Sequence, residues 1–249
     1  MSDSNNPFPI LYHYHHQNFT EDLPFWEGLA RWVGSPILEL GCGTGRVLLP
    51  LAQNGHTIYG IDHSPAMLDF LRQRIPAELQ SNIHLIEANM VDFDLETNFQ
   101  LVLLPCNTYS SFDHQAREQM LKHIFQHLKP GGVFAVSMPN PNLLAALQTN
   151  DDPDVEIIFY HPESGHPVQV SSTWEKSDNT VNINWHYDHL LPDGKIERLT
   201  ATVTHYLATM EDYVTEMIAA GFTIQSTYRN FETGPYKPDA SYLVIVAKK

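Results

Sequence analysis

The sequence ILELGCGTGRV at residues 37–47 constrains the fold of this 249-residue chain more than any other feature. An apolar run ends in glycines at positions 41, 43 and 45, which predicts a buried strand, a glycine-rich turn and a helix. Such a turn usually receives a nucleotide, because backbone N–H groups at the helix start face the ligand. The dinucleotide fingerprint G-x-G-x-x-G is not met, since Arg46 stands where its third glycine belongs.

Two acids beside this turn narrow the choice of ligand. Glu39 lies two residues before the first glycine, where a carboxylate disfavours a pyrophosphate and favours an ammonium group. Asp62 ends the next predicted strand, and neighbouring parallel strands bring it beside the turn, where it can accept hydrogen bonds from ribose hydroxyls. The sequence therefore predicts a ligand that has a ribose and a positive charge and needs no phosphate.

Strands and helices alternate along the first part of the chain. This spacing is typical of right-handed βαβ units, so we expect an α/β fold with a doubly wound, mostly parallel, seven-stranded Rossmann-like sheet. A helix is expected over about 22–33 with Asp22 as its cap, and another over about 45–53 with a kink at Pro50. Ser64 followed by Pro65 predicts the start of a further helix.

The pattern divides the chain into four parts. Residues 1–19 are aromatic and His-rich without a clear period, which indicates an arm or a lid in which Tyr12 and Tyr14 cover the cofactor. Residues 20–150 form the cofactor-binding core, and residues 151–208 alternate with period two, which predicts an antiparallel β insertion of three or four strands after the fifth strand. Residues 209–249 supply a helix, capped by Thr209 and Asp212, and the last two strands of the core.

The motifs together resemble the class I S-adenosylmethionine-dependent methyltransferases of small-molecule type. The resemblance rests on E-x-G-x-G-x-G, GIDHSPAML, EANMVDF, HLKPGGVFAVS and AAGF, and it covers about 37–138 and 209–249. It implies S-adenosylmethionine as cofactor and S-adenosylhomocysteine as product. It also implies that Asp62 binds the ribose, Asn89 the adenine amino group, and that Met90 packs near the ring. The full expected cofactor site is Glu39, Gly41, Cys42, Gly43, Gly45, Asp62, His63, Asn89, Met90 and Pro105.

The acceptor should approach the segment PCNTYSSFDH, which follows the fourth strand. Its candidate catalytic residues are Asn107, Tyr109 and His114, as positioning groups or a base. A neutral amine acceptor needs no base, whereas an alcohol would need one, for which His114 is the nearest candidate. An antiparallel insertion at this point is similar to that of small-molecule N-methyltransferases, so an amine is the expected acceptor.

Charge and composition exclude other partners. The net charge of −15 disfavours nucleic acid and anionic membranes, and the D/N-P-P-Y/F/W signature of DNA amino-methyltransferases is absent. We expect no metal site, because the His runs lack a matching cluster of carboxylates or Cys. The absence of an apolar targeting segment and the presence of two Cys alone predict a cytoplasmic protein.

Two other functions stay open at this stage. An NAD-dependent oxidoreductase is disfavoured by Glu39 and Arg46. A relative that binds the cofactor without catalysis, with the β insertion as a homodimer interface, is the other alternative.

Overall fold

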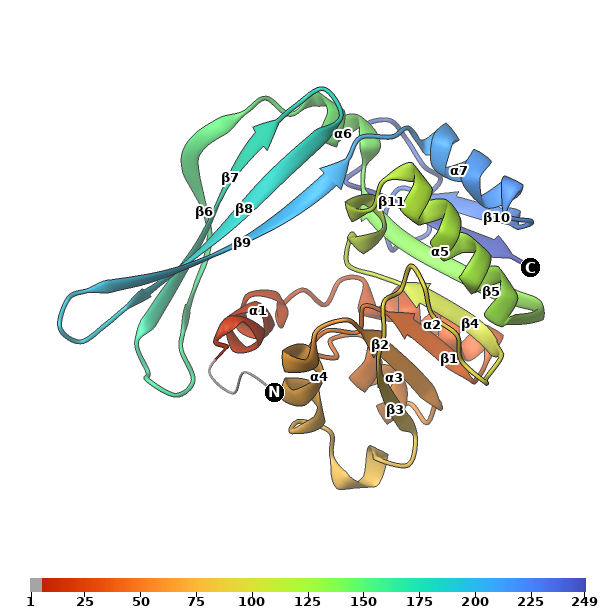
Figure 1. Cartoon of the computed structure of the whole chain (residues 1–249), viewed down its shortest axis with the longest axis horizontal. Helices are drawn as coiled ribbons and strands as arrows, with labels where there is room; N and C mark the ends of the chain where they lie inside the picture. Colours follow the sequence, from red (N-terminus) through yellow and green to blue (C-terminus); the bar gives the residue numbers. More distant parts are fainter. Residues whose placement is uncertain (1–5) are drawn as a thin grey trace.

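The computed structural model describes residues 6–249, and its main element is a seven-stranded sheet of order β10-β11-β5-β4-β1-β2-β3 (Figure 1). β11 is antiparallel to both of its neighbours, and the other paired strands are parallel. The predicted fold class is therefore confirmed. The strands are β1 (Ile37–Leu40), β2 (Ile58–Asp62), β3 (Ile83–Glu87), β4 (Phe99–Leu104), β5 (Leu128–Pro139), β10 (Thr223–Tyr228) and β11 (Tyr242–Lys248).

Helices cover both faces of this sheet (Figure 1). One face is covered by α5 (His114–His127) and α7 (Met210–Ala219), whose Met120 and Tyr213 are buried with Leu38 and Phe134 of the strands. The other is covered by α2 (Leu23–Val33), α3 (Leu48–Gln53) and α4 (Pro65–Arg72). The predicted caps of α4 and α7 form: Ser64 accepts from the Met67 N–H, and Thr209 and Asp212 make a capping box.

Two local predictions about the helices are wrong. The helix after the glycine turn begins at Leu48, so Pro50 lies in its first turn, where its missing N–H leaves no helical bond unmade and no kink is required. Asp22 precedes α2 but its carboxylate makes no cap, because it binds the side chains of Arg46 and Trp26 instead.

The insertion is a four-stranded antiparallel sheet that extends away from the core (Figure 1). Its outer face carries cross-strand polar pairs, including Asn184 with Thr202 and Asn182 with Thr204. Its inner face is apolar and aromatic, with Val170, Tyr187 and Leu199 in one row across the strands. The elements are α6 (Pro141–Ala146), which leads into the sheet, and β6 (Asn150–Tyr160), β7 (Pro167–Lys176), β8 (Thr180–Leu190) and β9 (Ile196–Tyr206).

The N-terminal segment contains a helix, α1 (Phe8–His16), which the sequence pattern did not reveal. Leu11 is buried against Phe159, Val168 and Tyr187 of the insertion, and α1 also contacts α4 of the core. Because its apolar side packs against a surface distant in sequence, this helix depends on tertiary contacts more than on its own periodicity. Figure 1 shows α1 between the insertion and the core.

Candidate functional site

The site lies at the switch point of the sheet, where β1 and β4 are neighbours and the chain leaves their carboxyl ends in different directions. Glycines 41, 43 and 45 all have positive φ, between +50° and +83°. A Cβ at Gly41 would lie 2.9 Å from Cε of Met90, and one at Gly45 would lie 2.4 Å from Cδ1 of Leu71. Gly43 differs, because nothing lies closer than 4.0 Å to its Cβ position. The turn thus has an open cradle at Gly43.

Asp62 fixes this turn against the end of β2. Its Oδ2 accepts from the Gly43 N–H at 2.9 Å, and its Oδ1 accepts from the Ser64 N–H at 2.8 Å. Each carboxylate oxygen has lone pairs left for a further donor. The expected position of Asp62 beside the glycine turn is therefore observed, and its ribose role stays a prediction.

Glu39 is a buried acid with an unused acceptor. Its side chain is 2% exposed, and Oε2 has no hydrogen-bond partner among residues 6–249. Burial raises the pKa of Glu39 to about 8, against the lowering effect of Arg46. Burying a carboxylate oxygen without a hydrogen-bond donor costs free energy, so a ligand with a positively charged donor group would be stabilised at this atom.

Arg46 ties the segment before α2 to the glycine turn. Its guanidinium makes a bidentate pair with the Asp22 carboxylate at 2.6 and 2.7 Å, and it donates to the Phe19 carbonyl and to Sγ of Cys106. Asp22 is 1% exposed and also accepts from the Trp26 indole N–H. Arg46, which stands where the dinucleotide fingerprint has its third glycine, therefore has a structural role.

α1 lies over the glycine turn. Cε1 of Tyr12 is 4.0 Å from the Cβ position of Gly43, and Nδ1 of His13 is 3.3 Å from the Thr44 hydroxyl. Burial raises the pKa of Tyr12 and, together with Arg74, lowers the pKa of His13 to about 4. Both groups are therefore neutral at pH 7.

The same helix meets the insertion through two more histidines. Nδ1 of His15 is 3.1 Å from the Tyr187 hydroxyl, and the His15 ring meets Trp185 edge-on. His16 stacks on Tyr12. Burial lowers the pKa of His15 to about 3 and also lowers that of His16. α1 thus contacts the glycine turn and the insertion through aromatic and uncharged imidazole groups.

The other expected cofactor residues have mixed surroundings. Met90 is 7% exposed and lies against Gly41, whereas the Asn89 side chain is exposed and its Oδ1 accepts from the Val91 N–H. The His63 side chain is 82% exposed, 3.7 Å from Asp62. Cys42 is buried with its sulfur toward Gly60, and Pro105 is buried at the end of β4, where its carbonyl accepts from Thr108. Cys42 and Cys106 are both free thiols.

The three expected acceptor-site residues have different surroundings. Asn107 follows Cys106, and both have left-handed backbones with φ of 63° and 64°, a strained pair at the expected place. Tyr109 is fully buried with its hydroxyl 3.4 Å from Glu216, and His114 binds Glu216 at 2.7 Å. Glu216 also pairs with Arg117. Tyr109 and His114 therefore belong to a network between α5 and α7, which favours a structural role for them.

A contact between the core and the insertion has no signal in the sequence. Ser110 of η2 (Thr108–Ser111) has its hydroxyl 2.9 Å from Nδ1 of His205, near the end of β9. Both residues are buried. They are 95 positions apart and carry no shared motif, so only the fold brings them together.

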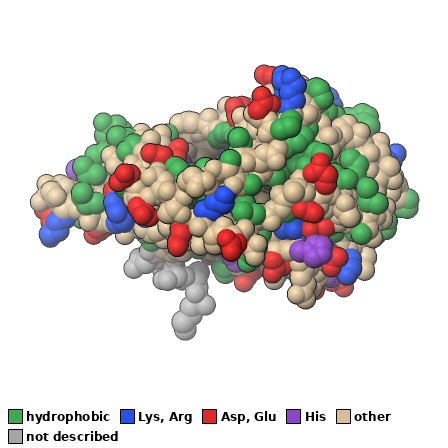
Figure 2. Space-filling view, turned by 90° about the horizontal axis from the view of Figure 1, so that it is seen from above, with side chains coloured by type: hydrophobic (Ala, Val, Ile, Leu, Met, Phe, Trp, Pro, Cys, Tyr) green, Lys and Arg blue, Asp and Glu red, His purple; other side chains and the backbone are tan. Residues whose placement is uncertain are grey.

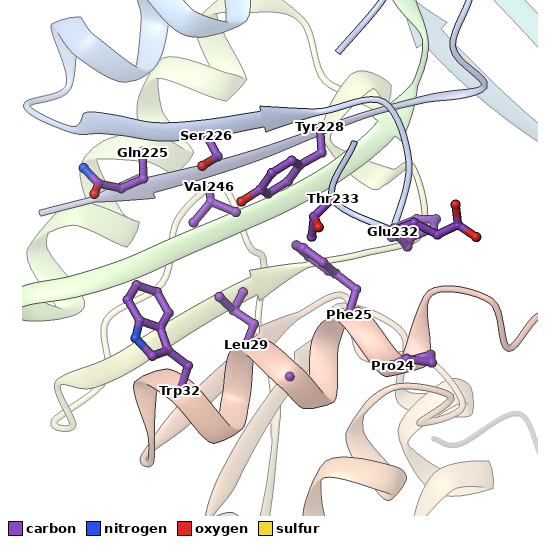
Figure 3. Close-up of a pocket in the computed structure, with 12 residues that line it drawn as sticks. Pro24, Phe25, Leu29, Trp32, Gln225, Ser226, Tyr228, Glu232, Thr233 and Val246 are labelled. Atoms are coloured by element: carbon purple, nitrogen blue, oxygen red, sulfur yellow. The ribbon is translucent and has the colours of Figure 1, made fainter. Parts of the chain in front are cut away.

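Other surfaces offer less chemistry. A groove of about 530 Å³ lies between α2 and the last two strands, beside Phe25, Trp32 and Tyr228 (Figure 3), and no expected site residue lines it.

On the face in Figure 2, acidic side chains are scattered and Lys and Arg form no continuous patch. Over residues 6–249, no three His, Cys, Asp or Glu gather in a metal-binding arrangement, and none of the helices is long and apolar enough to cross a membrane.

Comparison with known proteins identifies a methyltransferase domain. Residues 37–132 match the model of a methyltransferase domain. The chain is similar in sequence and fold to S-adenosylmethionine-dependent methyltransferases, as the resemblance predicted. It is 30% identical over 122 residues to a cypemycin N-terminal methyltransferase from Streptomyces sp, a match that spans 46% of this chain and 49% of the relative.

Solved structures of methyltransferases share the fold over nearly the whole chain. An S-adenosylmethionine-dependent methyltransferase from Clostridium acetobutylicum superposes with a TM-score of 0.81 at 15% identity and covers 98% of this chain and 99% of its own. The sugar N-methyltransferase KedS8 from Streptoalloteichus sp gives 0.74 at 20% identity, with 96% and 92% covered. The insertion and α1 are therefore part of a shared architecture.

The residues of this methyltransferase fit its cofactor, S-adenosylmethionine. Oε2 of Glu39 lacks the donor that an ammonium group would bring, and the cradle at Gly43 has room beside a carboxylate that still has lone pairs. The positive charge of the ligand also suits two neighbouring acids. The NAD alternative is not supported by the family match.

Proposed function

We propose that this methyltransferase transfers a methyl group to an amine of a small-molecule acceptor held between the glycine turn, α1 and the insertion. The observation that carries the proposal is the combination of an unpartnered buried acid at Glu39 with uncharged imidazoles on α1, the helix that lies over the same turn. The buried acid suits the ammonium group of the methyl donor, and the uncharged imidazoles suit a neutral acceptor. The N-methyltransferases among its structural relatives favour an amine in addition.

The residues of the chain mainly bind, orient and exclude water. When bound, S-adenosylmethionine supplies a methyl group on a sulfonium, which is already a strong methylating agent. Glu39 would hold the donor's ammonium, and Asp62 its ribose. α1 would cover the donor through Tyr12 and keep the space dry. Alignment of this kind corresponds to effective molarities of about 10⁵–10⁸ M, which removes the need for a strong base.

The lowered pKa values of the α1 histidines favour an amine over an alcohol as the acceptor. His15 and His16 have lowered pKa values because they are buried, so they are weak bases. An alcohol needs a base to remove its proton as it is methylated. An amine attacks through its own lone pair and can lose its proton to solvent afterwards.

Calorimetry and turnover test the proposal. The protein is titrated with S-adenosylmethionine, S-adenosylhomocysteine and NAD, and the release of S-adenosylhomocysteine is then followed on matched panels of amines and alcohols. We expect binding of the first two ligands and turnover on amines. Binding without any turnover would favour the non-catalytic alternative, and turnover on alcohols alone would contradict the amine assignment.

A further inference from the structure

A chain of three hydrogen-bonding groups links the strained segment after β4 to the insertion. The Ser110 hydroxyl donates to the Asn107 carbonyl at 3.0 Å, and the same oxygen is 2.9 Å from Nδ1 of His205. A hydroxyl has one hydrogen, so Ser110 must accept from His205 if it donates to Asn107. Nδ1 of His205 therefore carries the hydrogen, and Nε2 carries the lone pair.

The lone pair on Nε2 of His205 has no hydrogen-bond partner in the described part of the protein, residues 6–249. Three side-chain atoms of these residues are both without a partner and fully enclosed, and Nε2 is not among them. Part of its surface is therefore accessible, although the residue as a whole is 5% exposed. Burial lowers the pKa of His205 to about 4, and no charged group contributes to the shift, so the ring is neutral at pH 7.

Cross-strand register puts His205 on the inner face of the insertion. It pairs with Val181, and the rows along the same face continue through Ile183 and Trp185 to Tyr187. Residues directly opposite in an antiparallel pair share a face, and every second residue returns to it. Trp185 and Tyr187 contact His15 of α1, so this face of the insertion is the one that faces α1.

The glycine turn is close to the other end of this chain of contacts. The Thr108 methyl is 3.9 Å from the Cβ position of Gly41, and Ser110 stands two residues further along the 3₁₀ helix. Two residues of such a helix advance about 4 Å. One short helix therefore spans from the donor-binding turn to His205.

We propose that Nε2 of His205 accepts a hydrogen bond from the N–H of the acceptor amine and thereby aims the amine lone pair at the methyl donor. This inference rests on the proposed function and names a specificity residue for it. Ser110 and Asn107 are positioning residues, because they set the tautomer of the ring. His205 takes no proton, since a methylated ammonium is a far weaker acid than its imidazolium.

One consequence concerns which amines react. A primary or secondary amine has an N–H to give to Nε2, whereas a tertiary amine has none and would cover this acceptor without giving it a partner. Sites built around a substrate donor discriminate strongly against analogues that lack it. We therefore expect methylation of primary and secondary amines and rejection of their N,N-dimethyl counterparts.

The first test is spectroscopic and needs no acceptor. In ¹⁵N-histidine-labelled protein, the His205 signals are identified by their loss in His205→Phe. We expect the neutral Nδ1–H tautomer at pH 7, still neutral at pH 5, and its loss in Ser110→Ala. An Nε2–H tautomer would overturn the proposal, because no lone pair would face the acceptor.

The second test compares variants on the amines that the wild type methylates. We expect His205→Phe to lower kcat/KM about tenfold or more at unchanged affinity for S-adenosylhomocysteine. His205→Gln, whose amide can donate to Ser110 and accept from the amine, should restore most of it. His186→Phe on the outer face of the neighbouring strand is the matched control and should change little.

The outcomes separate the two proposals. Wild-type turnover on amines with full activity of His205→Phe, or with losses that follow its melting temperature, would overturn the role of His205 alone. No turnover on any amine would overturn the proposed function, and the role of His205 with it.

Discussion

The backbone N–H of Gly43 donates to Oδ2 of Asp62 across 2.9 Å, so the open glycine of the turn and the acid that ends β2 hold each other in place. The Asp62 carboxylate therefore holds the turn in shape, and in the proposed function its remaining lone pairs would bind the ribose. A single substitution can separate these effects if affinity and stability are both measured.

Asp62→Ala is expected to lose most of the affinity for S-adenosylhomocysteine while the protein stays folded. Charge-assisted hydrogen bonds contribute about 1.5–3 kcal/mol, which corresponds to about a 10- to 150-fold weaker Kd by calorimetry. Asp69→Ala removes an exposed acid of α4 and is the control. Unchanged affinity in Asp62→Ala would rule out the ribose assignment.

Gly43→Val should also block the cofactor, because its side chain would project into the cradle from a residue with φ of +50°. Backbone strain alone would lower stability without explaining a loss of binding. Gly55→Val is the matched control, since Gly55 has φ of +87° and open space around its Cβ position. Binding of S-adenosylhomocysteine by both variants alike would count against the cradle.

Much of the core was predictable from the sequence because its signals are local. The glycine turn, the cap at Ser64 and the capping box at Thr209 each depend on residues a few positions apart, and all three form as expected. The family resemblance drew on the same segments.

The acceptor side was less predictable, because its contacts join distant parts of the chain. α1 has no clear period of its own and packs on the insertion through Leu11. The contact of Ser110 with His205 depends on strand register that no motif announces. The sequence pointed to polar residues after β4 for the acceptor, and two of them, Tyr109 and His114, contact Glu216 instead of an open site.

The Arg46–Asp22 pair should be important for stability. Both side chains are largely buried, and removing one partner of such a pair leaves a charge without compensation, at a cost of about 3–5 kcal/mol. We expect that loss in the free energy of unfolding for Arg46→Met, measured with urea. Arg72→Met breaks an exposed pair with Asp69 and should cost about 0–1 kcal/mol. Equal losses in both variants would contradict the importance of the buried pair.

The raised pKa of Glu39 predicts that, as pH increases, the stability of the free protein falls and its affinity for the cofactor rises. Its pKa rises on folding from 4.5 to about 8 because the carboxyl is buried, so the folded protein without ligand holds a proton that the unfolded chain releases. Stability from this group therefore falls as pH rises through this window. The ionised form binds an ammonium group better, so affinity for S-adenosylmethionine should rise from pH 6 to 8.

Glu39→Gln is the matching variant. It cannot ionise, so it should melt at a higher temperature than the wild type at pH 8.5 without ligand and should bind the cofactor weakly, with little change between pH 6 and 8. Melting curves and titrations at both pH values check this. A wild-type affinity that is flat with pH, or tight binding by the variant, would be inconsistent with an ammonium contact at Glu39.

The docking of α1 should weaken in acid. Burial, with smaller contributions from Arg74 for His13 and from His16 for His15, lowers the pKa of His13 to about 4 and that of His15 to about 3, whereas both would titrate near 6.5 if the helix detached. The detached form then binds more protons, so docking loses free energy as pH falls below 6.5 and is unaffected above about 7.5. Cleavage within α1 should be faster at pH 5 than at pH 7.5. His15→Gln, which keeps a partner for Tyr187 without titrating, should reduce this difference, and the exposed His63→Gln should not.

Removal of residues 1–19 tests whether α1 serves as a lid over the cofactor. Tyr12 lies against the Gly43 position and His13 against Thr44, so a bound ligand would be covered by this helix, and displacement at a sulfonium requires water to be excluded. We expect the truncated protein to bind S-adenosylhomocysteine more weakly and to lose turnover. We also expect the ligand to protect α1 from proteolysis in the intact chain. Melting temperature is the control, because Leu11 also packs on the insertion. A truncated protein that binds as tightly as the intact one, with α1 equally cleavable with and without ligand, would show that the helix is a structural strut and no lid.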